Sequence, residues 1–155
     1  MTRSKRAASA QRNREPTVAY LLFSAYREMQ TRIFTALTHA GYGDVTPAQA
    51  RLFRSIGPEG TRLTDIAQAA NISKQTAGFL VDQLVRSGYV TRVPDPADAR
   101  ARLVKIAPKG AAAIPIATAV VAKVEAEWAA QVGADRMESL RDVLEALWQA
   151  TESFH

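Results

Sequence analysis

The chain has 155 residues, 47% of them hydrophobic and 23% charged, with a formal net charge of +5 and no cysteine. This size and composition predict one globular domain, and the absence of cysteine excludes a disulfide framework, a thiolate metal site and a thiol nucleophile. The sequence has no apolar run long enough to span a membrane and no secretory signal at its N-terminus, so we expect a cytoplasmic protein.

The charge is distributed unevenly along the chain. Residues 1–15 hold five Lys or Arg against one acid, residues 61–110 hold eight against four, and residues 111–155 hold three against seven. Basic charge concentrated in residues 1–15 and 61–110 is expected of a protein that neutralises the phosphates of a nucleic acid. The acidic segment, residues 111–155, should then be directed away from DNA.

The N-terminal part is predicted to contain a tail and two helices. Residues 1–16 have almost no large apolar side chain, so we expect a disordered basic tail, either an arm that adds salt-sensitive DNA affinity or a solvated segment. Apolar residues at three- and four-residue spacing predict a long helix over residues 17–39, which residues 41–44 interrupt. Thr46 is expected to cap a second helix, with Pro47 at its first position.

Two short helices joined by a tight turn are predicted next. Thr64 is placed to cap the first helix, residues 64–70. Ser73 can cap the second, residues 74–87, and Gly88 supplies the left-handed position that ends it. This order predicts a helix-turn-helix.

The second helix has an apolar and a polar face. An inward stripe is predicted at helical spacing, formed by Ala77, Leu80, Val81, Leu84 and Val85. The outward face has its hydrogen-bond donors at the N-terminal end, which enters the major groove in helix-turn-helix proteins and favours phosphate. The alternative is a solvated helix in an ordinary helical domain.

A two-stranded ribbon, or wing, is predicted over residues 90–106, with turn chemistry at residues 94–98. A short extended piece near residues 61–63 is expected to pair with it. Arginine on a projecting ribbon suits the narrow minor groove. Asp98 is expected to hold the Arg100 guanidinium by a charge-assisted pair. The alternative is an exposed salt bridge of little energetic value.

Two further apolar helices are predicted after Pro108, the first ending at Gly133 and the second running over residues 135–151. They are more apolar than a small winged domain needs. The sequence alone does not separate a subunit interface from a core at these positions.

Residues 72–110 (ISKQTAGFLVDQLVRSGYVTRVPDPADARARLVKIAPKG) resemble the recognition helix and wing of the MarR (multiple antibiotic resistance regulator) transcription factors, including their Asp-x-Arg wing tip. The resemblance extends over roughly residues 17–151. It implies a mainly α fold with a small β wing (α+β), in which a winged helix-turn-helix at 46–108 is flanked by dimerisation helices at 17–40 and 108–152.

The same resemblance implies a DNA-binding transcriptional regulator. The expected protein is a homodimeric, ligand-responsive repressor on a near-palindromic operator in double-stranded DNA. The recognition helix, residues 74–87, would enter the major groove and the wing would lie at the minor groove.

The chain departs from the family pattern at several positions. Phe79 stands where many members have arginine or another polar residue, and Gly78 where many have serine or threonine. Phe79 either touches a thymine methyl group or lies against the neighbouring helix. Ala99 replaces a common second arginine of the wing tip, and Ala107 replaces a threonine that often caps the next helix.

Candidate binding residues follow from these patterns. The DNA-binding candidates are Thr64, Ser73, Lys74, Gln75, Thr76, Gly78, Phe79, Gln83, Asp98, Arg100 and Arg102. The resemblance also implies a small effector, often aromatic and anionic, between the dimerisation helices and the DNA-binding lobe. Residues that could line its cavity are Tyr20, Tyr26, Arg27, Phe34, His39 and Trp128, although helix-spaced aromatic residues are more often core.

Enzymatic activity is not expected, and neither is a metal or another cofactor. The sequence has two histidines, no glycine-rich phosphate loop after a strand and no HExxH spacing. The alternative to a regulator is a helical protein-interaction module with a basic surface and no sequence-specific DNA binding.

Overall fold

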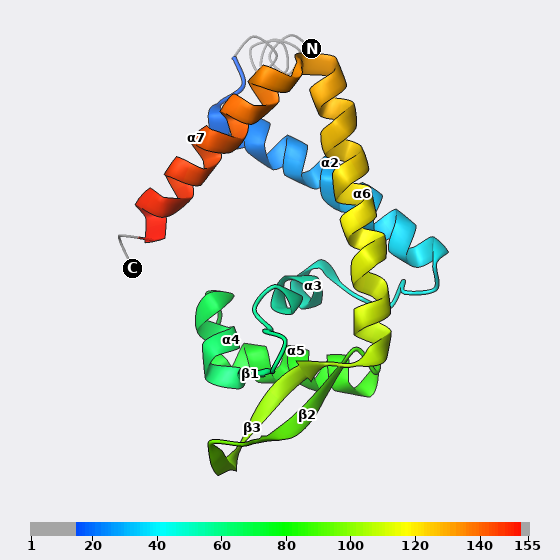
Figure 1. Cartoon of the computed structure of the whole chain (residues 1–155), viewed down its shortest axis with the longest axis vertical. Helices are drawn as coiled ribbons and strands as arrows, with labels where there is room; N and C mark the ends of the chain where they lie inside the picture. The colour runs from blue at the N-terminus through cyan, green and yellow to red at the C-terminus, as the bar shows by residue number, and fades with distance from the viewer. Residues whose placement is uncertain (1–14, 153–155) are drawn as a thin grey trace, which may run out of the picture.

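The computed structural model describes residues 15–152, which form a small lobe and a frame of three long helices (Figure 1). The lobe consists of α3 (Pro47–Phe53), β1 (Thr61–Arg62), α4 (Leu63–Ala69), α5 (Lys74–Arg86), β2 (Val90–Asp95) and β3 (Asp98–Ile106). The frame consists of α2 (Val18–His39), α6 (Pro108–Val132) and α7 (Ala134–Glu152). The expected class, mainly α with a small β wing, is confirmed. The predicted tail lies outside the described residues except for its last two.

Side-chain caps begin both helices of the N-terminal part, and the cap predicted at Thr46 is confirmed. The Thr17 hydroxyl accepts a hydrogen bond from the Tyr20 amide at 3.2 Å and begins α2. At α3, the Thr46 hydroxyl accepts from the Gln49 amide while the Gln49 side chain accepts from the Thr46 amide, a complete capping box with Pro47 at the first position. Local side-chain chemistry therefore sets both helix starts.

The start of α4 differs from the prediction. Thr64 is not its cap, because the helix begins at Leu63 with Arg62 at the N-cap position and no side-chain cap bond. The reason lies in the sheet: Arg62 is paired with Leu103 of β3, so the chain passes from strand β1 directly into the helix. The expected pairing of this short extended piece with the wing is confirmed.

The core of the lobe fixes the orientation of α5. It is a single apolar cluster of Val45, Leu52, Ile56, Ile66, Val81, Leu84, Tyr89, Val90 and Val104. Ala77, Val81 and Leu84 are buried, while Leu80 and Val85 are partly buried against the same cluster. The predicted inward stripe of α5 is therefore confirmed. Its opposite face is held toward solvent by the packing of the stripe.

The wing has the predicted bounds, but its two strands extend closer to the tip than expected. The sheet has the strand order β1-β3-β2, and β2 pairs with β3 from Val90 opposite Ile106 to Asp95 opposite Asp98. The expected turn at 94–98 is reduced to two residues, because the Asp95 carboxylate accepts the Ala97 amide at 2.8 Å and closes the turn from within the strand.

A junction cluster of Asp44, Ser87, Tyr89 and Lys109 joins the lobe to the frame. The Tyr89 hydroxyl donates to Asp44, and the Lys109 ammonium lies 3.1 Å from the Asp44 carboxylate, 2.9 Å from the Ser87 carbonyl oxygen and 4.2 Å from the centroid of the Tyr89 ring. Burial, together with the bond to Asp44, raises the pKa of Tyr89. The cluster links the end of α5 to the first turn of α6.

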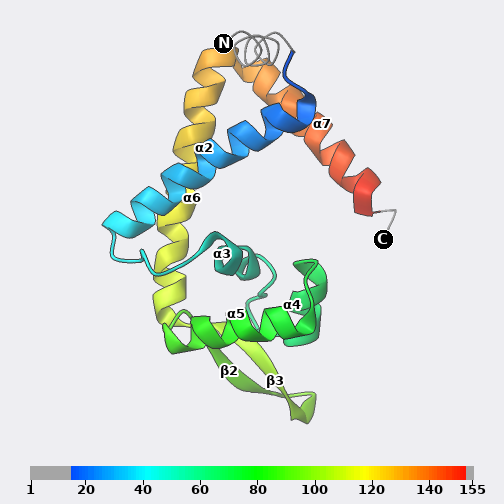
Figure 2. The same cartoon turned by 180° about the vertical axis from the view of Figure 1, so that it is seen from behind.

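The frame helices leave large apolar side chains uncovered. Figures 1 and 2 show α2 crossing α6 and α7 folding back from the far end of α6. Arg32 of α2 donates two hydrogen bonds, 2.5 and 2.9 Å long, to Glu127 of α6. The exposed apolar residues of α2 and α7 are Val18, Tyr20, Leu21, Leu22, Phe23, Tyr26, Leu140, Val143, Leu144, Leu147 and Trp148. None of the helices within residues 15–152 is long and apolar enough to cross a membrane.

Candidate nucleic-acid interface

The first turn of α5 projects from the lobe with its donors exposed. The Ser73 hydroxyl accepts from the Thr76 amide at 3.0 Å, which confirms the predicted cap, and it lies 2.8 Å from the Thr76 hydroxyl. Lys74, Gln75 and Thr76 are exposed. Other backbone N–H groups of the first turn have no partner within the helix, so this end can receive a phosphate or a base edge.

Three predicted residues of α5 have different surroundings. Phe79 is 59% exposed, so its ring is not covered by a neighbouring helix. Gly78 is half-buried, and a Cβ there would lie 3.6 Å from Leu63. Gln83 is also half-buried, and its side-chain oxygen accepts from Gln49 at 3.0 Å. Phe79 thus faces outward, whereas Gly78 and Gln83 lie toward the rest of the lobe.

An acidic residue on the outward side of α5 is paired with the wing. The Asp82 carboxylate lies 2.7 Å from the guanidinium of Arg92 on β2, and both side chains are partly exposed. The pairing offsets a negative charge that would otherwise repel phosphate. It also connects α5 to the wing.

The wing tip differs in one detail from the prediction. Asp98 does not hold the Arg100 guanidinium; its carboxylate accepts the Arg100 backbone amide at 3.0 Å and so shapes the backbone of the tip. The physical reason is proximity, because an amide two residues along the chain lies within reach of a short carboxylate side chain. Arg100 and Arg102 are both exposed on β3.

An ion pair between the start of α4 and the wing was not predicted from the sequence. Arg62 lies beside Asp95, with Nε and Nη2 at 2.8 and 2.6 Å from the same carboxylate oxygen. The Asp95 side chain is only 6% exposed. The Ala97 amide and then the Arg62 guanidinium hold the pKa of Asp95 below its usual range. We call Arg62 and Asp95 the wing clamp, because they join the base of α4 to the wing.

Comparison with known proteins shows which family the winged-helix part of the chain resembles. Residues 43–101 match the model of the MarR family. They contain α3, α4, α5, β1, β2 and the wing tip. The winged-helix part of this chain is thus similar to the MarR family. No curated protein sequence matches the chain.

Solved structures show the same fold beyond the matched segment. A crystal structure of MarR is 23% identical, with a TM-score of 0.68 over 86% of this chain and 96% of that one. A probable transcriptional regulator from Pseudomonas aeruginosa is 25% identical, with a TM-score of 0.63 over 84% and 96% of the two chains. A mutant of S. aureus MepR bound to an oligodeoxyribonucleotide is 21% identical, with a TM-score of 0.55 over 88% and 99%.

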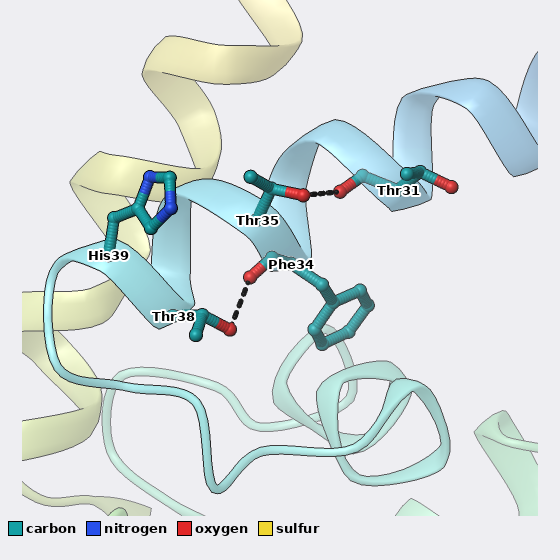
Figure 3. A pocket seen from close by; sticks show the side chains of 5 residues that line it. All are labelled: Thr31, Phe34, Thr35, Thr38 and His39. Carbon is teal, nitrogen blue, oxygen red and sulfur yellow. Dashed lines mark hydrogen bonds between the residues drawn. The ribbon is translucent and has the colours of Figure 1, made fainter.

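The predicted effector residues are distributed over separate surfaces of the chain. Phe34 and His39 line a hollow of about 380 Å³ on α2, together with Thr31, Thr35 and Thr38. Figure 3 shows the Phe34 and His39 rings pointing away from each other and two threonine hydroxyls bonded to backbone carbonyl oxygens of their own helix.

The remaining candidates lie elsewhere. Trp128 lines a second hollow of about 340 Å³ between α6 and α7, which also includes Trp148. Tyr20, Tyr26 and Arg27 are exposed on the first half of α2 and line neither hollow. A single protomer therefore does not bring the six predicted effector residues together.

Acid is expected to weaken the wing clamp. Because folding lowers the pKa of Asp95, the unfolded chain takes up its proton at a higher pH than the folded chain does. The ionised Asp95 therefore stabilises the fold fully above its ordinary pKa of 3.8, and this stabilisation is lost as the pH falls through the lower pKa of the folded state. We expect Asp95→Asn to lower the free energy of unfolding at neutral pH and to flatten its loss in acid. Urea unfolding across the acid range measures both effects.

The matched control for this prediction is Asp142→Asn, which changes an exposed aspartate on α7. It should retain the acid dependence of the unaltered protein. An Asp95→Asn protein with that same acid dependence would show that the clamp contributes nothing to the pH profile.

Proposed function

We propose that this chain is a ligand-responsive transcriptional repressor that binds a near-palindromic operator as a homodimer. The recognition helix α5 would enter the major groove and the wing would lie at the minor groove. One observation supports this most: both views place the α4 end of the lobe, from which α5 begins, on the same side as the wing tip (Figures 1 and 2). The exposed donors of α5 and the exposed wing arginines can therefore meet one duplex together.

The dimer is supported by the exposed apolar surface of the frame. Phe23 of α2 is 57% exposed, and Leu147 and Trp148 of α7 are 51% and 64% exposed. Soluble monomers rarely expose so many large apolar side chains together, and a second copy can cover them in a closed two-fold arrangement. The acidic balance of residues 111–155 suits a surface turned away from DNA.

Repression would follow from occupancy of the operator. In a dimer, the two copies of α5 would be about 34 Å apart, one turn of the duplex. A small aromatic or anionic effector bound near the frame would favour another spacing and lower operator affinity through a population shift. The junction cluster supports this proposal, because it couples the first turn of α6 to the end of α5.

The experiment that tests the function is a comparison of DNA affinities. The intergenic DNA beside the protein's own gene and a scrambled duplex are titrated at two salt concentrations, and the protein's mass in solution is measured. We expect a dimer that prefers the intergenic duplex at both salt concentrations. Equal binding to both duplexes that disappears as salt rises would contradict the proposal and favour the protein-interaction module.

Arg100→Ala is expected to weaken operator binding about tenfold, within the usual range for a groove-contacting arginine. Arg100 is exposed, so the free energy of unfolding should not change. Fluorescence anisotropy with the preferred duplex measures the affinity, and urea unfolding checks the fold. Lys123→Ala, which removes one exposed positive charge from α6, is the control. Unchanged affinity in the Arg100 variant would remove the wing tip from the interface.

A further inference from the structure

Phe79 has an unusual environment for a large apolar side chain. It is 59% exposed, whereas the other large apolar residues exposed to a comparable degree within residues 15–152 all lie on the frame helices α2, α6 and α7. The other large apolar residues of the winged helix are therefore buried or partly buried, and Phe79 is the exception among them. The free protein leaves the ring in water, so burial within the fold does not account for a phenylalanine here.

The position of Phe79 on α5 places it among polar groups. Gln75 lies one turn before it and Arg86 about two turns after it, and both are exposed on the same side of the helix. The opposite side carries the buried residues Ala77 and Val81. Phe79 is therefore near the centre of the outward face, about 6 Å along the helix from Gln75.

We propose that Phe79 is a specificity-determining residue that recognises a thymine by packing against its C5 methyl group. This inference rests on the proposed placement of α5 in the major groove. A phenyl ring has no donor or acceptor for a base edge, and the thymine methyl is the apolar feature of that groove. Gln75 can donate a hydrogen bond to an adenine and accept one from it. Gln75 and Phe79 would then contact neighbouring bases of one operator half-site.

A protein partner is the competing occupant for an exposed phenylalanine. The surroundings favour DNA, because the capped N-terminus of α5 and the exposed Lys74, Gln75 and Arg86 suit phosphates and polar base edges. The test below separates the two occupants.

The test removes single methyl groups from the DNA. A preferred duplex is selected from a random pool, and each thymidine is replaced by deoxyuridine at equivalent places in both half-sites, which leaves every Watson–Crick hydrogen bond intact. For the unaltered protein, we expect one replacement to weaken binding about threefold to tenfold, as expected for the loss of one or two buried methyl groups. Replacements elsewhere should change the affinity little.

Two variants, Phe79→Ala and Phe79→Leu, test whether the phenyl ring is responsible for the loss of affinity on deoxyuridine replacement. The alanine variant should bind both duplexes equally, whereas leucine, which retains an apolar contact, should keep part of the preference for thymidine. Gln68→Ala, which alters an exposed side chain on α4, is the control and should preserve the full preference. Since Phe79 is exposed, the free energy of unfolding should be unchanged in its variants.

Other outcomes would overturn the inference. If no deoxyuridine replacement weakens the unaltered protein, Phe79 does not recognise a thymine methyl, and retained affinity in Phe79→Ala would then favour the protein partner. A methyl effect that persists in Phe79→Ala would assign it to another residue. An unaltered protein that selects no duplex from the pool would contradict the proposed function itself, and the inference would fail with it.

Discussion

Gly110→Ala is expected to lower the free energy of unfolding by about 2 kcal/mol or more. Gly110 lies in the first turn of α6, where a Cβ would be 2.3 Å from the Tyr89 carbonyl oxygen and 2.9 Å from the Phe53 ring. The Tyr89 carbonyl cannot move freely, because it accepts the Ala107 amide at 3.0 Å at the corner between the wing and α6. Chemical denaturation of the purified variant measures the effect.

The control for this prediction is Gly78→Ala in α5. Both glycines are helical, and helix propensity alone favours alanine by about 1 kcal/mol at each position. At Gly78 an added Cβ would meet only Leu63, at 3.6 Å, an ordinary contact. We therefore expect Gly78→Ala to be neutral or slightly stabilising. If the two substitutions change the free energy of unfolding equally, the corner between the wing and α6 can accommodate an extra methyl group, which would contradict the tight packing seen there.

Leu147→Glu is expected to convert the protein to monomers and to weaken operator binding about 100-fold or more. Leu147 is 51% exposed on α7, so in the proposed dimer a buried glutamate would carry a large desolvation cost. Once the two recognition helices are separate, they bind their half-sites independently, and the avidity of the linked pair is lost. Mass in solution and affinity for the preferred duplex are measured on the same preparation.

Ala146→Glu supplies the matched control, because it adds the same charge one residue earlier in α7, on the side away from Leu144 and Trp148. It should remain dimeric and bind DNA normally. If Leu147→Glu also remains dimeric at low protein concentration, the exposed face of α7 is not the dimer contact, and α2 becomes the remaining candidate for that role.

The helix-turn-helix could be predicted from the sequence because its signals are local. Ser73 caps α5 as expected, the predicted stripe is buried, and Gly88 has the left-handed φ of 78° that ends the helix. Capping and periodicity involve residues one or two turns apart, so neighbouring residues are sufficient to specify them. The order of helices and strands in the winged helix could be predicted for the same reason.

Several features of the site could not be predicted because they join distant segments. The wing clamp joins residues 33 positions apart, and the Gln49–Gln83 bond joins residues 34 apart. No periodicity specifies such pairs; packing of the lobe brings them together. The start of α4 belongs to the same class, since pairing of β1 with β3 overrides the local preference for Thr64 as a cap.

The sequence by itself therefore determined the elements of this protein, its basic winged unit and most of the residues proposed to face DNA. Only the tertiary structure decided the direction of individual side chains: Phe79 outward, Gly78 and Gln83 toward the lobe, and Asp98 onto its own backbone. The physical reason is that helices and turns form from short-range bonds, whereas the surroundings of a side chain depend on residues that folding alone brings close.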